Sequence, residues 1–177
     1  MSKKLITKDK TFALILVLIS ILLIWLWLSP SGAQSAPEIT VTTLSGKKIT
    51  LGKSNQRPVL VTFWATSCST CISEVPHLKK LYAKLKSKGF QLIGVAMLYD
   101  RPDLVVNMVK QLNINYPVVF DINGKIFKAF KLKRKLTPTS ILIAPNNRIV
   151  MLKIGRMNIH AIEQTIQKML TNTKKTI

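Results

Sequence analysis

The two cysteines of the chain, Cys68 and Cys71, are separated by two residues, a spacing at which two thiols can close a small disulfide ring. They follow the uninterrupted apolar run 59–64, which is typical of a strand in the middle of a sheet. After Cys71, apolar residues recur at helical spacing, so the pair stands where a strand gives way to a helix. Unpaired N–H groups at a helix start favour an anionic thiolate. The sequence therefore predicts dithiol–disulfide exchange, with the disulfide as the redox group and with no cofactor or metal.

A purely structural disulfide is the alternative for the same two residues. The stabilisation that a disulfide provides grows with the length of the loop it closes, and this loop is very short. A chain of 177 residues is also long enough to build a core without such a bridge. Redox chemistry is therefore the better interpretation.

Strands and helices alternate around the cysteines, which predicts an α/β fold with a central mixed sheet flanked by helices. The expected order is a hairpin, three strand–helix units, a second hairpin and a final helix. Pro76 lies inside the helix that follows the cysteines, so we expect a kink there. The predicted strands are residues 39–42, 48–51, 59–64, 90–97, 117–120, 140–144 and 148–153, and the predicted helices are 71–88, 102–112, 124–130 and 158–170.

An N-terminal segment precedes this pattern. Residues 12–28 carry no charge and one serine, and are at the short end of what crosses a bilayer as a helix. Four lysines precede them, so the positive-inside rule keeps residues 1–11 in the cytoplasm and exports the rest. We expect a single-pass protein of the inner (cytoplasmic) membrane with a signal-anchor at 12–28, a linker at 29–36 and a domain at 37–177 in the periplasm or extracytoplasmic space.

Cleavage of this segment is the alternative to a retained anchor. Ser31, Gly32 and Ala33 offer small residues of the kind a signal peptidase uses. The apolar run exceeds the about 7 to 15 residues of a typical signal core, which favours retention.

The chain is strongly basic, with a formal net charge of +20. No helix-turn-helix, zinc-finger spacing or basic helix accompanies this charge, so we expect no nucleic acid partner. The charge favours an anionic membrane surface or acidic partners, or reflects a bias of the source organism. Part of it precedes Leu136 directly and would be a solvated face or would steer an acidic partner to the site; this basic run consists of Lys131, Lys133, Arg134 and Lys135.

Two motifs resemble a known family. The segments Phe-Trp-Ala-Thr-Ser-Cys-Ser-Thr-Cys at 63–71 and Leu-Thr-Pro-Thr at 136–139 resemble the thioredoxin fold. A glutamate three residues after the second cysteine, followed two residues later by a proline, is similar to the membrane-anchored TlpA/ResA branch. The resemblance covers about residues 37–170. The chain departs from many relatives at Ser67, where they carry a tryptophan, and at Ser69-Thr70.

The resemblance implies roles for six residues. Cys68 would attack the substrate disulfide and Cys71 would resolve the mixed disulfide. Glu74 would take the proton from Cys71, although a glutamate on a helix is often only a solvated side chain. The remaining three surround the pair: Pro138 would be cis and face the cysteines, the backbone of Thr137 would bind the substrate strand, and Trp64 would pack beside the site.

The resemblance also implies partners. They are exported proteins with disulfides, such as apocytochrome c or copper-site assembly proteins, and a transmembrane thiol electron donor. The same chemistry in reverse, as a thiol oxidase or isomerase, is one alternative. A Cu(I)-binding or chaperone module is another, because soft thiolates suit Cu(I). We expect His77 and His160, the two histidines of the chain, to be surface or helix residues rather than ligands.

Overall fold

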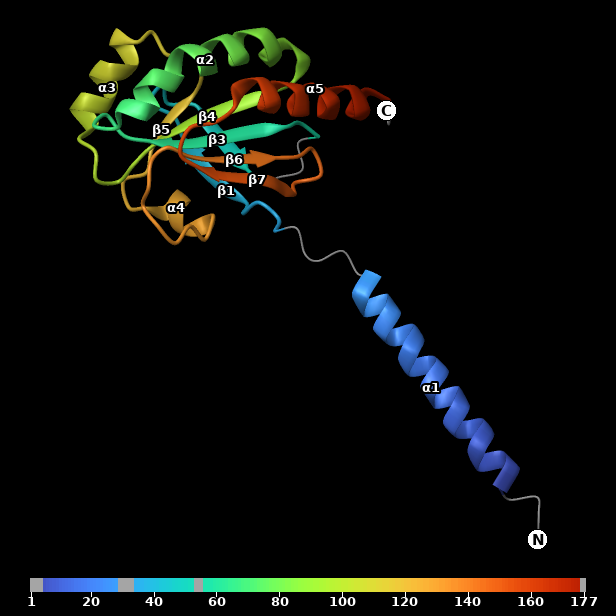
Figure 1. Cartoon of the computed structure of the whole chain (residues 1–177). Coiled ribbons are helices and arrows are strands. Elements are labelled where there is room, and N and C mark those ends of the chain that lie inside the picture. Colours follow the sequence, from blue (N-terminus) through green and yellow to red (C-terminus); the bar gives the residue numbers. More distant parts are fainter. Residues whose placement is uncertain (1–4, 29–33, 53–55, 176–177) are drawn as a thin grey trace. The chain divides into compact units, whose positions relative to one another are not determined.

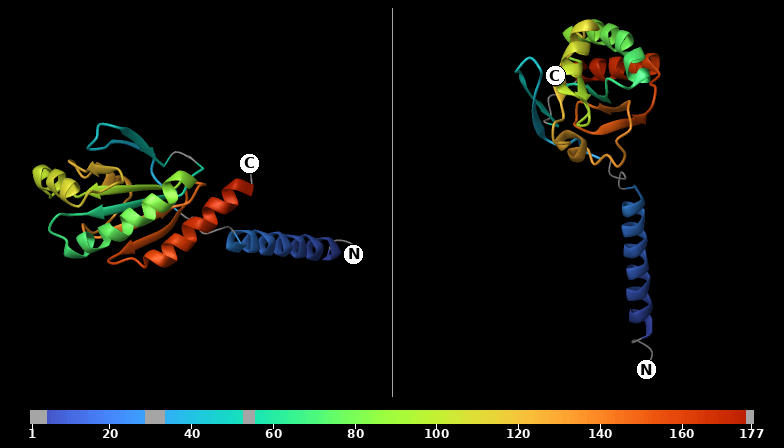
Figure 2. Two further views of the ribbon diagram at one scale, coloured as in Figure 1. Left: turned by 90° about the horizontal axis from the view of Figure 1, so that it is seen from above. Right: turned by 90° about the vertical axis from the view of Figure 1, so that its left-hand side faces the viewer.

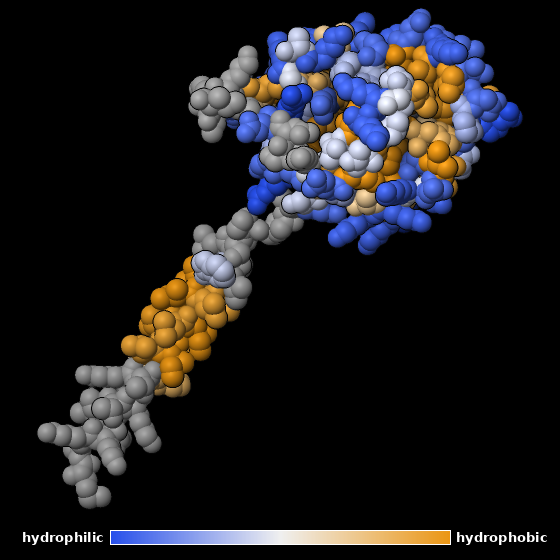
Figure 3. Space-filling view, turned by 180° about the vertical axis from the view of Figure 1, so that it is seen from behind, coloured by the Kyte–Doolittle hydropathy of each residue, from blue (hydrophilic) through white to orange (hydrophobic). Residues whose placement is uncertain are grey.

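The computed structural model describes residues 5–28, 34–52 and 56–175. The chain divides into a first unit that ends at Ala33 and a second unit, Gln34–Ile177. Within the first unit, helix α1 (Leu5–Leu28) is continuous. Its described side chains, at residues 12–25, are exposed and almost all apolar (Figure 3).

The predicted anchor thus forms one helix with the residues before it. Among the residues that the structure describes, no helix is both long enough and apolar enough to cross a membrane. The spanning role of residues 12–28 therefore stays a prediction. Residues 1–4 of the basic N-terminus and the possible cleavage site at 31–33 lie outside the described residues.

The second unit contains a five-stranded mixed sheet with the strand order β5-β4-β3-β6-β7 (Figure 1). The central strand β3 pairs in parallel with β4, which pairs in parallel with β5. On its other side β3 pairs antiparallel with β6, and β6 pairs antiparallel with β7. The predicted mixed sheet is confirmed. The strands are β3 (Val59–Trp64), β4 (Gln91–Ala96), β5 (Val118–Phe120), β6 (Thr139–Ile143) and β7 (Ile149–Ile154).

Both faces of this sheet are covered, which explains why every residue of β3 is buried. Alternate residues such as Leu60 and Leu142 pack with α2 (Ser69–Leu85), α3 (Pro102–Gln111) and α5 (Ile159–Lys175). The intervening residues, such as Val61 and Phe63, pack on the other side with α4 (Lys125–Ala129) and the β1–β2 hairpin. Figure 2 shows these layers from two further directions.

The hairpin of β1 (Ile39–Thr42) and β2 (Lys48–Leu51) is antiparallel, as predicted. Its end attaches to the edge of the sheet, where Leu44 N–H donates to the Val118 carbonyl over 2.8 Å. Residues before the hairpin are also attached, because Ile149 N–H donates to the Gln34 carbonyl. The compact unit therefore begins at Gln34, before the predicted domain boundary at 37.

Helix α2 begins at Ser69 rather than at Cys71, because Cys68 occupies its N-cap. It continues through Pro76 to Leu85, where a 3₁₀ turn (Lys86–Lys88) ends it at Gly89. Helix α5 extends to Lys175, beyond the predicted end at residue 170. Leu170 is its last buried apolar residue, so the sequence periodicity carried no signal for the final turn.

Candidate active site

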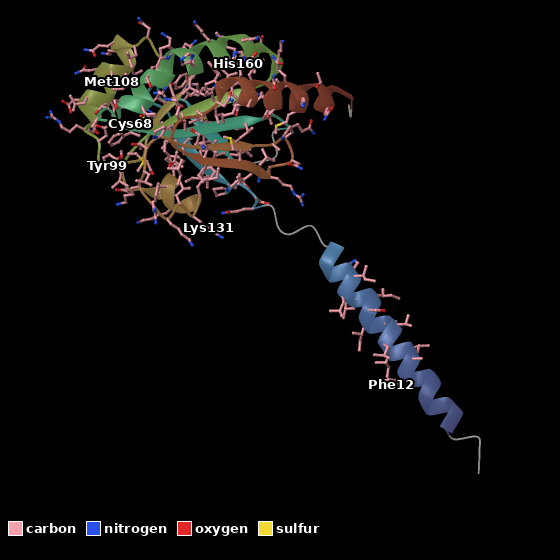
Figure 4. The ribbon with its side chains drawn as sticks, in the orientation of Figure 1. Phe12, Cys68, Tyr99, Met108, Lys131 and His160 are labelled. Atoms are coloured by element: carbon pink, nitrogen blue, oxygen red, sulfur yellow. A yellow bond between two sulfur atoms is a disulfide. The ribbon has the colours of Figure 1, made fainter. Side chains whose placement is uncertain are left out.

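The cysteine pair lies at the start of α2, immediately beyond the carboxyl end of β3 (Figure 4). Cys68 and Cys71 form a disulfide, with their Cα atoms 5.3 Å apart. Cys68 is partly exposed, whereas Cys71 is buried. The Sγ atom of Cys68 accepts a hydrogen bond from Cys71 N–H over 3.2 Å. The sulfur of Cys68 thus accepts from an amide at the helix start that has no carbonyl partner within the helix. This contact favours the thiolate form of Cys68 once the pair is reduced.

A carboxylate from a neighbouring loop positions the segment before the cysteines. Asp100 follows β4, and its two oxygens accept hydrogen bonds from N–H and Oγ1 of Thr66, each over 2.6 Å. Met97 N–H also donates to the Trp64 carbonyl over 3.0 Å. These bonds hold the two loops together at the carboxyl edge of the parallel strands. The sequence analysis missed Asp100, because the contact joins residues 34 apart and no local pattern marks it.

Glu74 is one helical turn beyond Cys71 and is only 3% exposed. Its Oε1 atom accepts a hydrogen bond from Met157 N–H over 2.6 Å, while its Oε2 atom is buried and has no partner among the described residues. A solvated helix glutamate is therefore excluded at this position.

Burial raises the pKa of the Glu74 carboxyl above its ordinary value of 4.5. The Met157 hydrogen bond and the charges of Arg156 and His77 oppose this rise in pKa without cancelling it. A carboxyl whose pKa lies nearer neutrality is a better proton acceptor and donor for a thiol than an exposed one.

Two aromatic residues complete the buried side of the site. Trp64 and Tyr116 belong to the same apolar cluster as Cys71. Burial raises the pKa of Tyr116, and the Glu74 charge raises it further, so the phenol stays neutral. Gly94 makes room for both, because a Cβ there would lie 3.1 Å from the Tyr116 ring and 3.2 Å from Nε1 of Trp64. Trp64 is buried in the same cluster as Cys71, while its expected contact with substrate stays a prediction.

The peptide bond between Thr137 and Pro138 is cis, as predicted. Pro138 is buried and its carbonyl accepts a hydrogen bond from Gly155 N–H over 2.8 Å. Thr139 pairs with Phe63 in the sheet, which places the dipeptide at the same edge as the cysteines. Neither N–H nor C=O of Thr137 has a backbone partner among the described residues. Both groups are thus available to an added strand.

Comparisons with known proteins agree with this geometry. The Redoxin family matches residues 31–170. The thiol-disulfide oxidoreductase ResA of Bacillus thuringiensis is 35% identical over 136 residues, which is 76% of each chain. The chain is a ResA-like thiol–disulfide oxidoreductase of the Redoxin family.

Other members of the family and of its fold are also similar. ResA of Bacillus subtilis is 30% identical over 129 residues, covering 73% of this chain and 70% of that protein. The thioredoxin domain of a thiol-disulfide oxidoreductase from Bacteroides vulgatus has a TM-score of 0.65 at 26% identity and covers 80% of this chain and 99% of that one. A thioredoxin family protein of Chlorobium tepidum, at 23% identity, shares the fold with a TM-score of 0.72 over 80% of this chain and 99% of that one.

Metal binding was an alternative use of the cysteines. In the described part of the chain, no three His, Cys, Asp or Glu side chains are grouped closely enough to hold a metal ion.

Proposed function

We propose that this oxidoreductase works as a reductase, with Cys68 as the attacking thiol and Cys71 as the resolving thiol. The observation that carries the proposal is the buried Glu74, one turn beyond the buried Cys71, with Oε2 unpartnered. A buried thiol needs a nearby base before it can attack, and the proposal gives this role to Glu74.

The proposed cycle begins with the reduced pair. The Cys68 thiolate attacks a substrate disulfide, forms a mixed disulfide and expels one substrate thiolate. Cys71 then transfers its proton to Glu74, and its thiolate attacks Sγ of Cys68. The second substrate sulfur leaves as a thiolate and takes a proton from water. Two electrons have passed from the cysteine pair to the substrate, and the pair ends as the Cys68–Cys71 disulfide.

A transmembrane thiol electron donor would restore the reduced pair. An oxidising compartment would otherwise leave the two cysteines as a disulfide. This part of the proposal follows from the expected export of the domain.

The domain is proposed to be tethered to the cytoplasmic membrane by residues 12–28, with the domain outside the cytoplasm. The support comes from the sequence, in which an uncharged apolar stretch follows a lysine-rich start. At 1.5 Å per residue, residues 12–28 would extend about 26 Å as a helix, slightly less than a hydrocarbon core of about 30 Å.

The proposed substrates are exported proteins with disulfides, for example apocytochrome c or copper-site assembly proteins. Two exposed apolar side chains stand at the edge of the sheet that carries the cysteines. Tyr99, in the loop held by Asp100, is 50% exposed, and Leu136, directly before Thr137, is 45% exposed. An extended segment paired with the Thr137 backbone would place apolar residues on these two side chains.

Trapping of the intermediate tests the proposed roles. The reduced Cys71→Ser variant, incubated with a disulfide-bonded apocytochrome c peptide, should accumulate a mixed disulfide at Cys68, identified by mass spectrometry. The Cys68→Ser variant serves as the matched control and should trap no adduct. An adduct that forms faster at Cys71 of the control variant would overturn the assignment of the two roles.

A further inference from the structure

The two histidines of the chain line one pocket. It has a volume of about 390 Å³ and lies between the first turns of α2 and the segment that joins β7 to α5. His77 comes from α2, and His160, which is labelled in Figure 4, comes from α5; both are exposed, as expected from the sequence. They are 83 residues apart in the sequence, so nothing local indicated that they share a site.

Glu74 also lines this pocket, although it is almost fully buried. Its unpartnered Oε2 atom requires a hydrogen-bond donor, because a buried acceptor without one costs about 1 to 3 kcal/mol. A pocket of this size holds several water molecules, and Oε2, which is sealed from solvent in this structure, would reach one of them through a small side-chain rotation. The pocket thus lies between Glu74 and bulk solvent.

The ionisable groups that face Glu74 differ in whether they can carry a proton. Cys71 is the proton source in the proposed cycle. Arg156, whose Nη2 donates to Ser73 Oγ over 3.4 Å, is always charged and cannot release a proton. Tyr116 keeps its proton, because burial and the Glu74 charge raise its pKa. Imidazole is the side chain that exchanges protons readily near neutral pH, which leaves the two histidines.

We propose that the pocket is a proton exit, in which His77 and His160 carry the proton of Glu74 to solvent. The inference rests on the proposed role of Glu74 as the base for Cys71. After Cys71 attacks, protonated Glu74 donates through pocket water to a neutral imidazole, and the imidazolium then releases the proton to bulk water. In the reverse reaction the same groups return a proton to the Cys71 thiolate as it leaves.

The test separates the two thiol steps in time. The reduced full chain, in detergent micelles, is mixed with the chromogenic disulfide DTNB in a stopped-flow instrument. The first thionitrobenzoate released reports the attack by Cys68, and the second reports the attack by Cys71. The double variant His77→Gln/His160→Gln should keep the first step. Its second step should slow roughly tenfold at neutral pH, less than the about 10² to 10⁴ in rate that a directly acting acid or base contributes, because Glu74 is retained.

Added imidazole supplies the distinguishing readout. It should restore the second step of the double variant in proportion to its concentration and leave the wild type unchanged. Arg156→Gln, which alters charge without removing a proton carrier, should show no dependence on imidazole. Lys80→Gln, an exposed substitution on α2 outside the pocket, is the matched control for both steps.

The outcomes are separable. A double variant as fast as the wild type would overturn the proton exit, and so would a slow one that imidazole does not rescue. A wild type that shows no first thionitrobenzoate release would instead contradict the proposed roles of the cysteines.

Discussion

Glu74 combines two properties that a stable core would avoid, burial of a carboxyl and an oxygen without a partner. One of its oxygens accepts a hydrogen bond from Met157 N–H, which holds the side chain in the interior of the domain. The other is left for proton exchange. In the proposed cycle, the energetic penalty of this burial supports proton transfer from Cys71.

The raised pKa of Glu74 gives a testable pH dependence of stability. The folded chain binds this proton more tightly than the unfolded chain does. Its contribution to stability is therefore full below pH 4.5 and is lost as the pH rises through the raised native pKa. Glu74→Gln keeps the acceptor for Met157 and removes the titration. Relative to this variant, the wild type should become less stable as the pH rises above 4.5, and the difference should level off above the raised native pKa, in urea unfolding followed by circular dichroism.

A wild-type and variant stability difference that stays constant across this range would contradict the raised pKa. The same variant should slow the second thionitrobenzoate release and leave the first unchanged.

At this scale the sequence predicted the residues that sit within one local motif. Cys68, Cys71 and Glu74 follow from spacing along one strand–helix junction, and Pro138 follows from the family resemblance. Asp100 did not emerge, because its partner Thr66 lies 34 residues earlier in the chain. Both histidines were expected at the surface, but their shared pocket was not, because His77 and His160 are 83 residues apart.

The elements were predicted best where both faces of a strand or one face of a helix are buried. The uninterrupted apolar run predicted β3, and the apolar residues at helical spacing predicted α2. The boundaries were predicted less well: α2 begins at Ser69, two residues before the predicted start, because Cys68 caps it. The attachment of residues 34–36 beside β7 had no signal, because it consists of backbone hydrogen bonds and one bond from the Asn147 side chain to the Ala36 carbonyl, which no local pattern marks.

The loop after β4 should depend on Asp100. Hydrogen bonds to a charged group contribute about 1.5 to 3 kcal/mol each. The side chain of Asn has one acceptor oxygen, so it can replace only one of the two hydrogen bonds that Asp100 accepts from Thr66. Asp100→Asn should lower the free energy of unfolding by about 1 to 3 kcal/mol, measured by urea denaturation. The neighbouring Asp103→Asn is the control, since its ion pair with Arg101 is fully exposed and should contribute nothing measurable. Equal effects of the two substitutions would contradict the role given to Asp100.

At the scale of the whole molecule, the net charge of +20 favours acidic partners. The basic run before Leu136 is exposed and leads into the loop that carries Thr137. Its charge acts over about 10 Å at 0.1 M salt, a range that includes the approach to the site.

Replacement of all four basic residues of this run with Gln should slow reduction of an acidic protein substrate at low salt. The effect should shrink as salt is added, because screening removes the steering. Rates measured at two ionic strengths, with an uncharged peptide disulfide as the control substrate, check this. A rate that is unchanged at low salt would show that the run is only a solvated face.

The central claim is that the pair donates electrons to its substrates, and the reduction potential of Cys68–Cys71 tests it most directly. The domain beginning at Gln34 includes its own core and the residues that attach beside β7, so it suits the measurement. Equilibration against glutathione and a thioredoxin standard should give a reduction potential of about −270 mV, that of thioredoxin. A value near about −120 mV, typical of a strong oxidant, would contradict the account and reverse the direction of the reaction.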